Sequence, residues 1–466
     1  MRTQPTTRRQ ILKLAILGSA GTALLAACAP AAPATAPTAA PAKAPDKPAA
    51  AQPTVAASEK PKPAQGVELR LHVRTGAEGT KTEAGIEAFQ KLNPNITVKL
   101  ESFPSDQYQD KLLTMAAGAT LGDVAFTHVG FYHQMADAGF WTALDPLIKS
   151  TNFDMSQYQK TGLDHLTWKG NLYALPYKGH TGHSGFWYNK EMLAKEGMDP
   201  PAPKSYDEII EIAKKLTKRS GDKTDVWGYT YPGHGAWELT AHLRAWGVDP
   251  VSPKLGATKA ELDQPTQMEA ILWIHALVHK HKVCPPFGTI DYAQIYTSGA
   301  VATRNAELPT HTLQQTIGNR FTQAVVSMPK GPGGKIPGFY NHDQMAMNAK
   351  TKFVNEAWTL QTYLCGKEHG IRLGRPEGGG AGTPGIRTDV WASKELEDAV
   401  PAIKVFREHL PQMETHWYAA NLQTLKVWNM TKQALDKILL NPADPKPADF
   451  KEANAIVQAV LDEPKL

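Results

Sequence analysis

Short apolar runs alternate with helical patterns from residue 67 onward, and this alternation restricts the fold more than any other feature of the sequence. The run VELRLHV (67–73) has the two-residue period of a strand, and KTEAGIEAFQKLNP (81–94) spaces its Ile, Phe and Leu three residues apart, as a helix does. ITVKLESF (96–103) is a second expected strand, DQYQDKLLTMAAGA (106–119) a second helix and GDVAFTHV (122–129) a third strand. This order predicts an α/β fold with a doubly wound sheet, in which ligands bind beyond the carboxyl ends of the strands.

The length of the chain indicates more than one lobe. About 400 of the 466 residues follow residue 65, which is more than a single hydrophobic core normally spans. We therefore expect two lobes, each with its own core. Only Cys284 and Cys365 are thiols in this part, and neither lies in a CxxC motif, so a disulfide between them and two free buried thiols both remain open.

A series of short motifs follows the first strand in an order that one known family shares. The motifs are GIEAFQKLNPNITVKLE, LGDV (121–124), KGNLYALP (169–176), WYNK (187–190), PKSYDE (203–208), GAVA (299–302), SMPKGPGG and NAKTKFVNEAWTLQTYL. In this order they resemble the extracellular solute-binding proteins of ABC importers, in the branch similar to maltose-binding protein. The resemblance covers essentially all of residues 67–440.

This resemblance implies the architecture of the chain. We expect two doubly wound α/β lobes joined by a hinge of three crossings, which is the periplasmic-binding-protein-like fold of class II topology, with the solute in the cleft between the lobes. The crossings fall near 177–183, 331–339 and 378–385, and all three are rich in glycine. Ordinary surface loops are the alternative for the glycine-rich stretches. The expected lobes are 67–178 with 340–380 (N-terminal) and 184–332 with 385–466 (C-terminal).

The first 28 residues have the pattern of an export signal. A basic head precedes an apolar run of about fourteen residues, whereas a membrane-spanning helix needs about 20. TRRQILK (7–13) resembles the twin-arginine export motif, and LAAC (25–28) resembles the bacterial lipobox. The resemblance implies that residues 1–27 are a signal peptide and that Cys28 is the lipidation site. A cleaved secretory signal with an incidental cysteine is the alternative.

Residues 28–65 follow as a linker that consists almost entirely of Ala, Pro, Thr and Lys. Such a segment has too few large apolar side chains to form a core and tends to extended polyproline conformations. We expect a lipid-anchored spacer that holds the exported protein at the outer face of the cytoplasmic membrane or in the periplasm.

The net charge gives no reason to expect nucleic acid as a partner. The chain carries +5 at neutral pH, but four of its 50 Lys and Arg and none of its 45 Asp and Glu lie in the expected signal, so the rest carries about +1. No cluster of basic residues interleaved with aromatic ones appears after the signal.

The residue types of the expected cleft favour a carbohydrate. A neutral polyhydroxylated solute is usually held by aromatic faces and by a few directional polar groups. Trp237 is the strongest stacking candidate, because it follows a glycine-rich turn and not a periodic helical face. Leu308 stands where the family usually has an aromatic residue, which argues against maltose-like oligosaccharides. The predicted ligand-binding residues are Thr75, Glu78, His128, Tyr177, His180, Trp187, Trp237, Asn341, His342 and Trp417, with His183 and Asp343 as further polar candidates.

The implied partners are a membrane permease and its ATPase, and we expect a monomer without a cofactor that is not an enzyme. A peptide, a polyol or a metal is the alternative solute, and an exported hydrolase is the alternative class. His180 with His183 or His279 with His281 could ligate a metal, but the latter two are expected on a helix, where residues two apart do not share a face. The sequence has no HExxH, and GHSGF lacks the second glycine of GxSxG.

Overall fold

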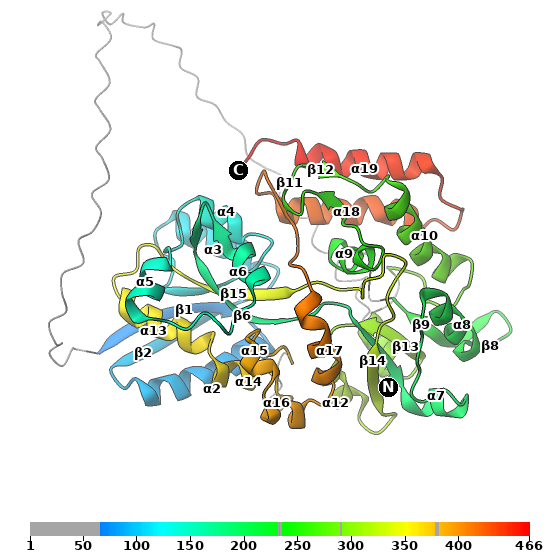
Figure 1. The fold of residues 1–466 in the computed structure, drawn as a ribbon, viewed down its shortest axis with the longest axis horizontal. Helices are drawn as coiled ribbons and strands as arrows, with labels where there is room; N and C mark the ends of the chain where they lie inside the picture. Colours follow the sequence, from blue (N-terminus) through cyan, green and yellow to red (C-terminus); the bar gives the residue numbers. More distant parts are fainter. Residues whose placement is uncertain (1–65, 232, 234, 289–290, 378–381) are drawn as a thin grey trace, which may run out of the picture. The chain divides into compact units, whose positions relative to one another are not determined.

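The computed structural model describes residues 66–231, 233, 235–288, 291–377 and 382–466 (Figure 1). The expected signal peptide, Cys28 and the linker lie outside the described residues, as does the part of the third crossing from 378 to 381.

The first sheet has the strand order β2-β1-β3-β15-β6 (Figure 1). Its strands are β1 (Val67–Arg74), β2 (Ile96–Phe103), β3 (Val124–Thr127), β6 (Ala174–His180) and β15 (Asn341–Met347). The first three are parallel, and β15 is antiparallel to both of its neighbours. The expected alternation of strand, helix and strand is therefore present in this sheet.

Helices α2 (Ala77–Leu92) and α3 (Tyr108–Ala117) connect the three parallel strands. Helix α2 begins four residues before the expected position and carries Glu78 in its first turn, where the helix dipole favours an acidic side chain. It ends at Leu92, and the backbone and side-chain N–H groups of the next residue, Asn93, both donate to the carbonyl of Phe89, so the expected Asn-Pro end of the helix is confirmed. Helices α13 (Val354–Leu364) and α14 (Lys367–Gly374) also belong to this part of the fold.

The second sheet has the strand order β14-β7-β13-β9-β8. Its strands are β7 (Gly185–Asn189), β8 (Lys218–Ser220), β9 (Lys223–Thr230), β13 (Val301–Ala306) and β14 (Gln323–Ser327). The pair β9 and β13 is parallel, whereas β7 is antiparallel to β13 and β14. Five longer helices lie with this sheet: α8 (Tyr206–Leu216), α9 (Ala236–Ala245), α10 (Pro265–His279), α18 (Thr424–Leu439) and α19 (Pro447–Leu461). Because α10 ends at His279, the expectation that His281 lies on the same helix was wrong.

Shorter elements complete the described chain. They are α4 (Tyr132–Asp137), α5 (Asp145–Thr151), α6 (Lys160–Leu166), β4 (Thr167–Trp168), β5 (Asn171–Leu172), α7 (Lys190–Lys195), β10 (Val251–Ser252), β11 (Leu255–Ala257), β12 (Lys259–Ala260), α11 (Tyr292–Thr297), η1 (Leu308–Thr312), α12 (Leu313–Ile317), α15 (Thr388–Trp391), α16 (Lys394–Ala399), α17 (Ile403–His409), η2 (Leu410–Gln412) and β16 (Tyr418–Ala419).

Each sheet has its own hydrophobic core. Phe126 lies in the core of the first sheet. On β7 of the second sheet, the neighbours Phe186 and Trp187 point to opposite faces, so Phe186 joins the core around α9 and α10 while Trp187 packs with the helices α15 to α17. Cys284 and Cys365 are buried free thiols in the two separate cores, and this separation keeps them apart.

Two chain segments cross between the sheets side by side. One leads from β6 to β7 and contains Gly182, and the other leads from β14 to β15 and contains Gly338. Both glycines have positive φ, of 63° and 130°. A Cβ atom on Gly338 would lie 2.2 Å from the carbonyl oxygen of Thr181, and one on Gly182 would lie 3.0 Å from the nitrogen of Phe339. Only glycine permits this contact between the two backbones.

No helix among the described residues has both the length and the apolar character that a bilayer crossing requires.

We expect Gly338→Ala to lower the free energy of unfolding by at least about 1 kcal/mol more than Gly334→Ala, measured by urea denaturation. Both positions have positive φ, but a Cβ atom on Gly334 meets no other atom within 4 Å, so the difference isolates the contact between the crossings. Equal losses in the two variants would contradict the close packing of these segments.

Candidate functional site

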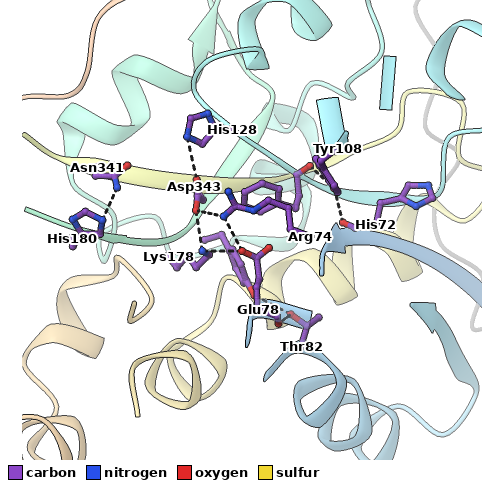
Figure 2. Close-up of polar contacts among 12 residues, drawn as sticks. His72, Arg74, Glu78, Thr82, Tyr108, His128, Lys178, His180, Asn341 and Asp343 are labelled. Carbon is purple, nitrogen blue, oxygen red and sulfur yellow. Dashed lines mark hydrogen bonds and ion pairs between the residues drawn. The ribbon is translucent and has the colours of Figure 1, made fainter. Parts of the chain in front are cut away.

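Chemically active side chains gather at one edge of the first sheet (Figure 2). Arg74 is the last residue of β1, His128 directly follows β3, His180 ends β6, and Asn341 begins β15. The register pairs Asn341 with His180, so the start of β15 lies at the same edge as the end of β6. This is the edge beyond which ligands bind in open α/β sheets, and both crossings leave the sheet here.

Four charged side chains form a closed ring of ion pairs at this edge, which we call the charge ring: Arg74, Glu78, Lys178 and Asp343 (Figure 2). The Nη2 atom of Arg74 lies 2.9 Å from Glu78 and 3.2 Å from Asp343. The Nζ atom of Lys178 lies 2.9 Å from Glu78 and 3.0 Å from Asp343. Each cation therefore contacts both carboxylates.

Burial makes the charges of this ring dependent on one another. Glu78 and Lys178 are buried, and the guanidinium of Arg74 lies over the ring of Phe126 at 4.2 Å. Burial alone would raise the pKa of Asp343, but the charges of Lys178 and Arg74 outweigh it and hold this pKa far below its ordinary value. Burial would lower the pKa of the Arg74 guanidinium, but the negative charges of Asp343 and Glu78 outweigh burial and raise this pKa. Asp343 and Arg74 are therefore charged at neutral pH, and the ring as a whole consists of two basic and two acidic side chains.

His128 joins the charge ring to the second lobe. The backbone N–H of Gly130 donates to its Nδ1 atom (3.2 Å), so the neutral imidazole carries its proton on Nε2, which lies 3.9 Å from Asp343. Burial lowers the pKa of His128 to about 4, although Asp343 acts in the opposite direction. On its other side, His128 lies 5.8 Å from the ring of Trp237, between centroids.

Trp237 reaches this place from the first turn of α9, and it is half-buried among aromatic rings. It stacks on His416 at 4.7 Å with an interplanar angle of 16°, and it meets Phe339 edge-on at 4.6 Å. Trp428 of α18 lies 5.4 Å away. We call Trp237, Phe339, His416 and Trp428 the aromatic cluster. It brings the second lobe and the second crossing against His128.

Two polar groups of the site keep free hydrogen-bonding capacity. The Oε1 atom of Glu78 has no hydrogen-bond partner among the described residues. One polar atom of the Asn341 amide lies 2.7 Å from Nε2 of His180, while its other polar atom has no partner within the described part of the chain. Buried polar atoms without partners are costly, so these atoms favour a ligand that carries hydrogen-bonding groups.

A carboxylate of the second lobe approaches the same region. Glu307 directly follows β13, and its Oε2 atom lies 3.1 Å from Nδ1 of His183. Burial would raise the pKa of Glu307, but His183, His180 and Arg304 lower it below its ordinary value. The backbone oxygen of His183 accepts a hydrogen bond from Asn305 at 2.6 Å, so the first crossing is tied to the end of β13.

The structure brings five of the predicted residues into this region: Glu78, His128, His180, Trp237 and Asn341. Thr75 is exposed directly after β1, and its backbone N–H donates to the carbonyl of Phe103.

The other four predicted residues have packing roles in this structure. The hydroxyl of Tyr177 lies 3.3 Å from Thr82, and the Nε2 atom of His342 lies 3.2 Å from His165. Trp417 is fully buried and donates its indole N–H to Thr240, and Trp187 is buried against Phe406. Neighbouring residues of a strand point to opposite faces, and so Lys178 and Asp343, each one position further along, join the charge ring while Tyr177 and His342 do not.

The residues predicted from the sequence did not include Arg74, Lys178, Glu307 or Trp428. Arg74 ends the strand β1 and Lys178 lies within the strand β6. A charged residue at such a position of an apolar strand could have indicated both of them as site residues. Phe339 and His416 gave no local signal, because only the tertiary fold brings them to Trp237. No group of three or more His, Cys, Asp or Glu among the described residues is arranged to hold a metal ion.

Comparison with known proteins identifies relatives of the chain. The family model of the bacterial extracellular solute-binding proteins matches residues 75–370. A putative binding protein of Brucella abortus is 22% identical over 324 residues, which cover 68% of this chain and 76% of that protein. An uncharacterized ABC transporter extracellular-binding protein of Pyrococcus horikoshii is 25% identical over 170 residues, 36% of this chain and 39% of that protein.

Solved structures share the fold. An ABC substrate-binding protein of Listeria monocytogenes in complex with cycloalternan superposes with a TM-score of 0.72 at 18% identity, over 85% of this chain and 99% of that one. A solute-binding protein of Thermotoga lettingae bound with α-D-tagatose superposes with a TM-score of 0.70 at 21% identity, over 85% of this chain and 100% of that one. The similarity confirms the expected two-lobed α/β fold of class II periplasmic binding proteins.

We expect Asp343→Asn to lower the free energy of unfolding by about 2 to 4 kcal/mol in urea denaturation, because the buried Lys178 and the partly buried Arg74 each lose one of their two counterions. The matched control is Asp164→Asn, which breaks an exposed pair between Lys160 and Asp164 on helix α6 and should leave stability within experimental error. Similar effects at the two positions would contradict a coupled charge ring.

We expect the free energy of unfolding to fall as the pH decreases from about 6.5 to about 4. Burial lowers the pKa of His128, His180 and His342 to about 4 and that of His133 to about 3, whereas an unfolded histidine titrates near 6.5. Below pH 6.5 the unfolded chain therefore binds more protons than the folded chain, and each extra proton contributes a slope of about 1.4 kcal/mol per pH unit.

Urea denaturation at pH values between 4 and 7.5 measures this slope. His133→Phe keeps an aromatic ring against Tyr418, on which His133 stacks at 3.8 Å, and removes one titrating group. Its slope should be smaller by about one proton. A stability that does not change between pH 6.5 and 4 would contradict the burial of neutral histidines.

Proposed function

Because the chain belongs to the family of bacterial extracellular solute-binding proteins, we propose that it captures a carbohydrate between its two lobes and delivers it to the membrane permease of an ABC importer. The protein binds its solute without converting it. The lobes of this proposal are residues 67–178 with 340–380 and residues 184–332 with 385–466, joined by the three crossings.

One observation carries the proposal: the charge ring of the first lobe and the indole of Trp237 from the second lobe meet on either side of His128. Sugars present hydroxyl groups around the ring and an apolar face of C–H groups. The free Oε1 atom of Glu78 and the free amide atom of Asn341 can bind hydroxyls, and an aromatic face can pack against the C–H face.

The electrostatics of the site also support an uncharged solute. The charge ring is neutral as a whole, with each cation between two carboxylates. An anion or a cation would have to break ion pairs that are already made, whereas hydroxyl groups can add hydrogen bonds to oxygen atoms that remain free.

The identity of the sugar is narrowed by Leu308. This residue begins η1 and is buried in the core with Trp187, and it stands where the family usually has an aromatic platform. The proposal is therefore a sugar other than a maltose-like oligosaccharide. The sugars bound in the two solved structures named above, cycloalternan and tagatose, support a carbohydrate as the solute class.

The site couples recognition to closure. A solute favours the closed arrangement only to the extent that it binds that arrangement more tightly than the open one. The solute site proposed here draws its groups from both lobes, so the contacts that select the sugar also hold the lobes together for the permease. The exported protein is anchored through acyl chains on Cys28, works as a monomer and reaches the permease on the spacer of residues 28–65.

A thermal-shift screen of the full chain against mono- and oligosaccharides, polyols, short peptides and divalent metals tests the proposal. Binding to the folded state adds about 2.7 kcal/mol of stability when the ligand is at 100 times its Kd, so we expect a shift of several degrees with one series of sugars. Shifts with metals or peptides alone would exclude the carbohydrate proposal.

We expect Trp237→Ala to cost about 1 to 3 kcal/mol of binding free energy for the sugar found in that screen, measured by isothermal titration calorimetry. Trp237→Phe is the matched control, because it retains an aromatic face against His416 and should recover part of the affinity. Unchanged affinity in Trp237→Ala would remove this residue from the site.

A further inference from the structure

The two lobes also meet outside the sugar site, between helix α4 of the first lobe and the segment that follows α19 in the second. Asp137 is the last residue of α4, and its carboxylate has three partners. The indole N–H of Trp168 donates to it at 3.0 Å, and the Nζ atom of Lys169 lies 2.6 Å away, both in the first lobe. The third partner is Lys465 of the second lobe, whose Nζ atom lies 2.8 Å from Asp137. The same ammonium lies over the ring of Trp168, 5.7 Å from its centroid, so it contacts both a charge and an aromatic face of the first lobe.

The second lobe holds Lys465 in place from both sides. The carbonyl of the preceding residue, Pro464, accepts a hydrogen bond from Nε2 of Gln423 at 3.1 Å. The backbone N–H of the following residue, Leu466, donates to the carbonyl of Asn421 at 3.2 Å. Because both neighbours are bound to the second lobe, Lys465 moves together with that lobe.

A second contact with the same lobe lies one turn earlier on α4. His133 and Asp137 are four residues apart, and residues at this spacing share a face of a helix. His133 stacks on Tyr418 of the second lobe, with 3.8 Å between the ring centroids. Helix α4 thus turns one face to the second lobe, with an aromatic stack at one end and an ion pair at the other.

Asp137 keeps partners when the lobes separate. The ammonium groups of Lys169 and Lys465 lower the pKa of Asp137 to about 2, so its carboxylate is ionised at neutral pH. In an open arrangement Lys465 leaves, while Lys169 and the indole of Trp168 stay with the carboxylate. The side chain of Lys465 is 46% exposed, so its ammonium regains water easily. The ion pair across the lobes can therefore break and reform without leaving a buried charge unpaired.

We propose that Asp137 and Lys465 form a latch that favours the closed arrangement of the lobes before a solute is bound. The inference rests on the proposed capture of a solute between two lobes, and it makes Lys465 a positioning residue that acts on the sugar site from outside it. No residue of the charge ring or of the aromatic cluster takes part in the latch. A larger closed population raises the apparent affinity for any solute that binds the closed arrangement, because the apparent Kd is the intrinsic Kd divided by the fraction of binding-competent protein.

Double electron–electron resonance tests the latch, because it measures the distance between the lobes in the absence of any solute. Nitroxide labels are attached to the full chain with Cys28→Ser, at Lys160→Cys on α6 and Lys451→Cys on α19, which are exposed positions of the two lobes. Cys284 and Cys365 are buried and stay unlabelled. We expect two distance populations, the shorter for closed and the longer for open chains.

Lys465→Met removes the ammonium and keeps most of the aliphatic side chain. It should raise the ratio of open to closed chains about two- to fivefold, which is the effect of losing a partly exposed ion pair. Lys169→Met is the matched control, because it removes an ammonium from the same carboxylate but within one lobe, and it should leave the ratio unchanged within experimental error. About 1 M NaCl should shift the chain with both lysines towards the ratio of Lys465→Met, since salt screens exposed charges.

A ratio of open to closed chains that Lys465→Met leaves unchanged would overturn the proposal, whether the labelled chain shows one distance population or two. Equal shifts in Lys465→Met and Lys169→Met would also overturn it, because the charge of Asp137 would then act through the stability of the first lobe and not across the lobes. The melting temperatures of both variants show that they fold. Because the measurement contains no solute, its failure would leave the carbohydrate proposal standing, and a failed sugar screen would leave the latch standing.

Discussion

The ion pairs among Arg74, Glu78, Lys178 and Asp343 are the constraint on which the rest of the site depends. The four side chains come from β1, α2, β6 and β15, so a single neutral ring ties the first parallel strand to the two strands that lead into the crossings. Removing one member would leave a buried charge without a counterion and would strongly destabilise the fold. Replacing the whole ring by apolar side chains of similar volume would change the stability much less. The ring therefore specifies how the crossings leave the sheet, more than it adds to stability.

Contacts between the lobes follow from this arrangement. His128 lies against the ring on one side and against Trp237 on the other. Further from the crossings, His133 stacks on Tyr418, and Thr161 accepts a hydrogen bond from the backbone of Thr415. These contacts use neutral histidines, aromatic rings and backbone groups, and none of them is an ion pair. Such contacts can break and reform as the lobes move at a smaller electrostatic cost than ion pairs.

The sequence predicted the fold well and the site in part, and the reasons differ. Periodic apolar patterns placed the first strands and helices within a few residues, because burial on one face leaves a direct trace in the sequence. Tyr177 and His342 were predicted as ligand-binding residues and Lys178 was not. The difference between these neighbours is the face of the sheet on which each side chain lies. That face is decided by tertiary pairing and by the bulge between Asp343 and Gln344. Trp417 and Trp428 sit eleven residues apart, yet only the fold buries one completely and leaves the other beside Trp237.

The contact between Gly182 and Gly338 has a consequence for how this chain can be rearranged. The polypeptide leaves the first sheet and returns to it at positions whose backbones touch, with the strands β7 to β14 in between. A segment whose two ends meet in this way has the geometry of an inserted domain, since its removal or exchange leaves only a short gap to close. The second sheet of a relative could thus be transplanted here only together with α18 and α19, because these helices follow the second crossing and complete the core of that sheet, and both glycines would have to stay at the junction.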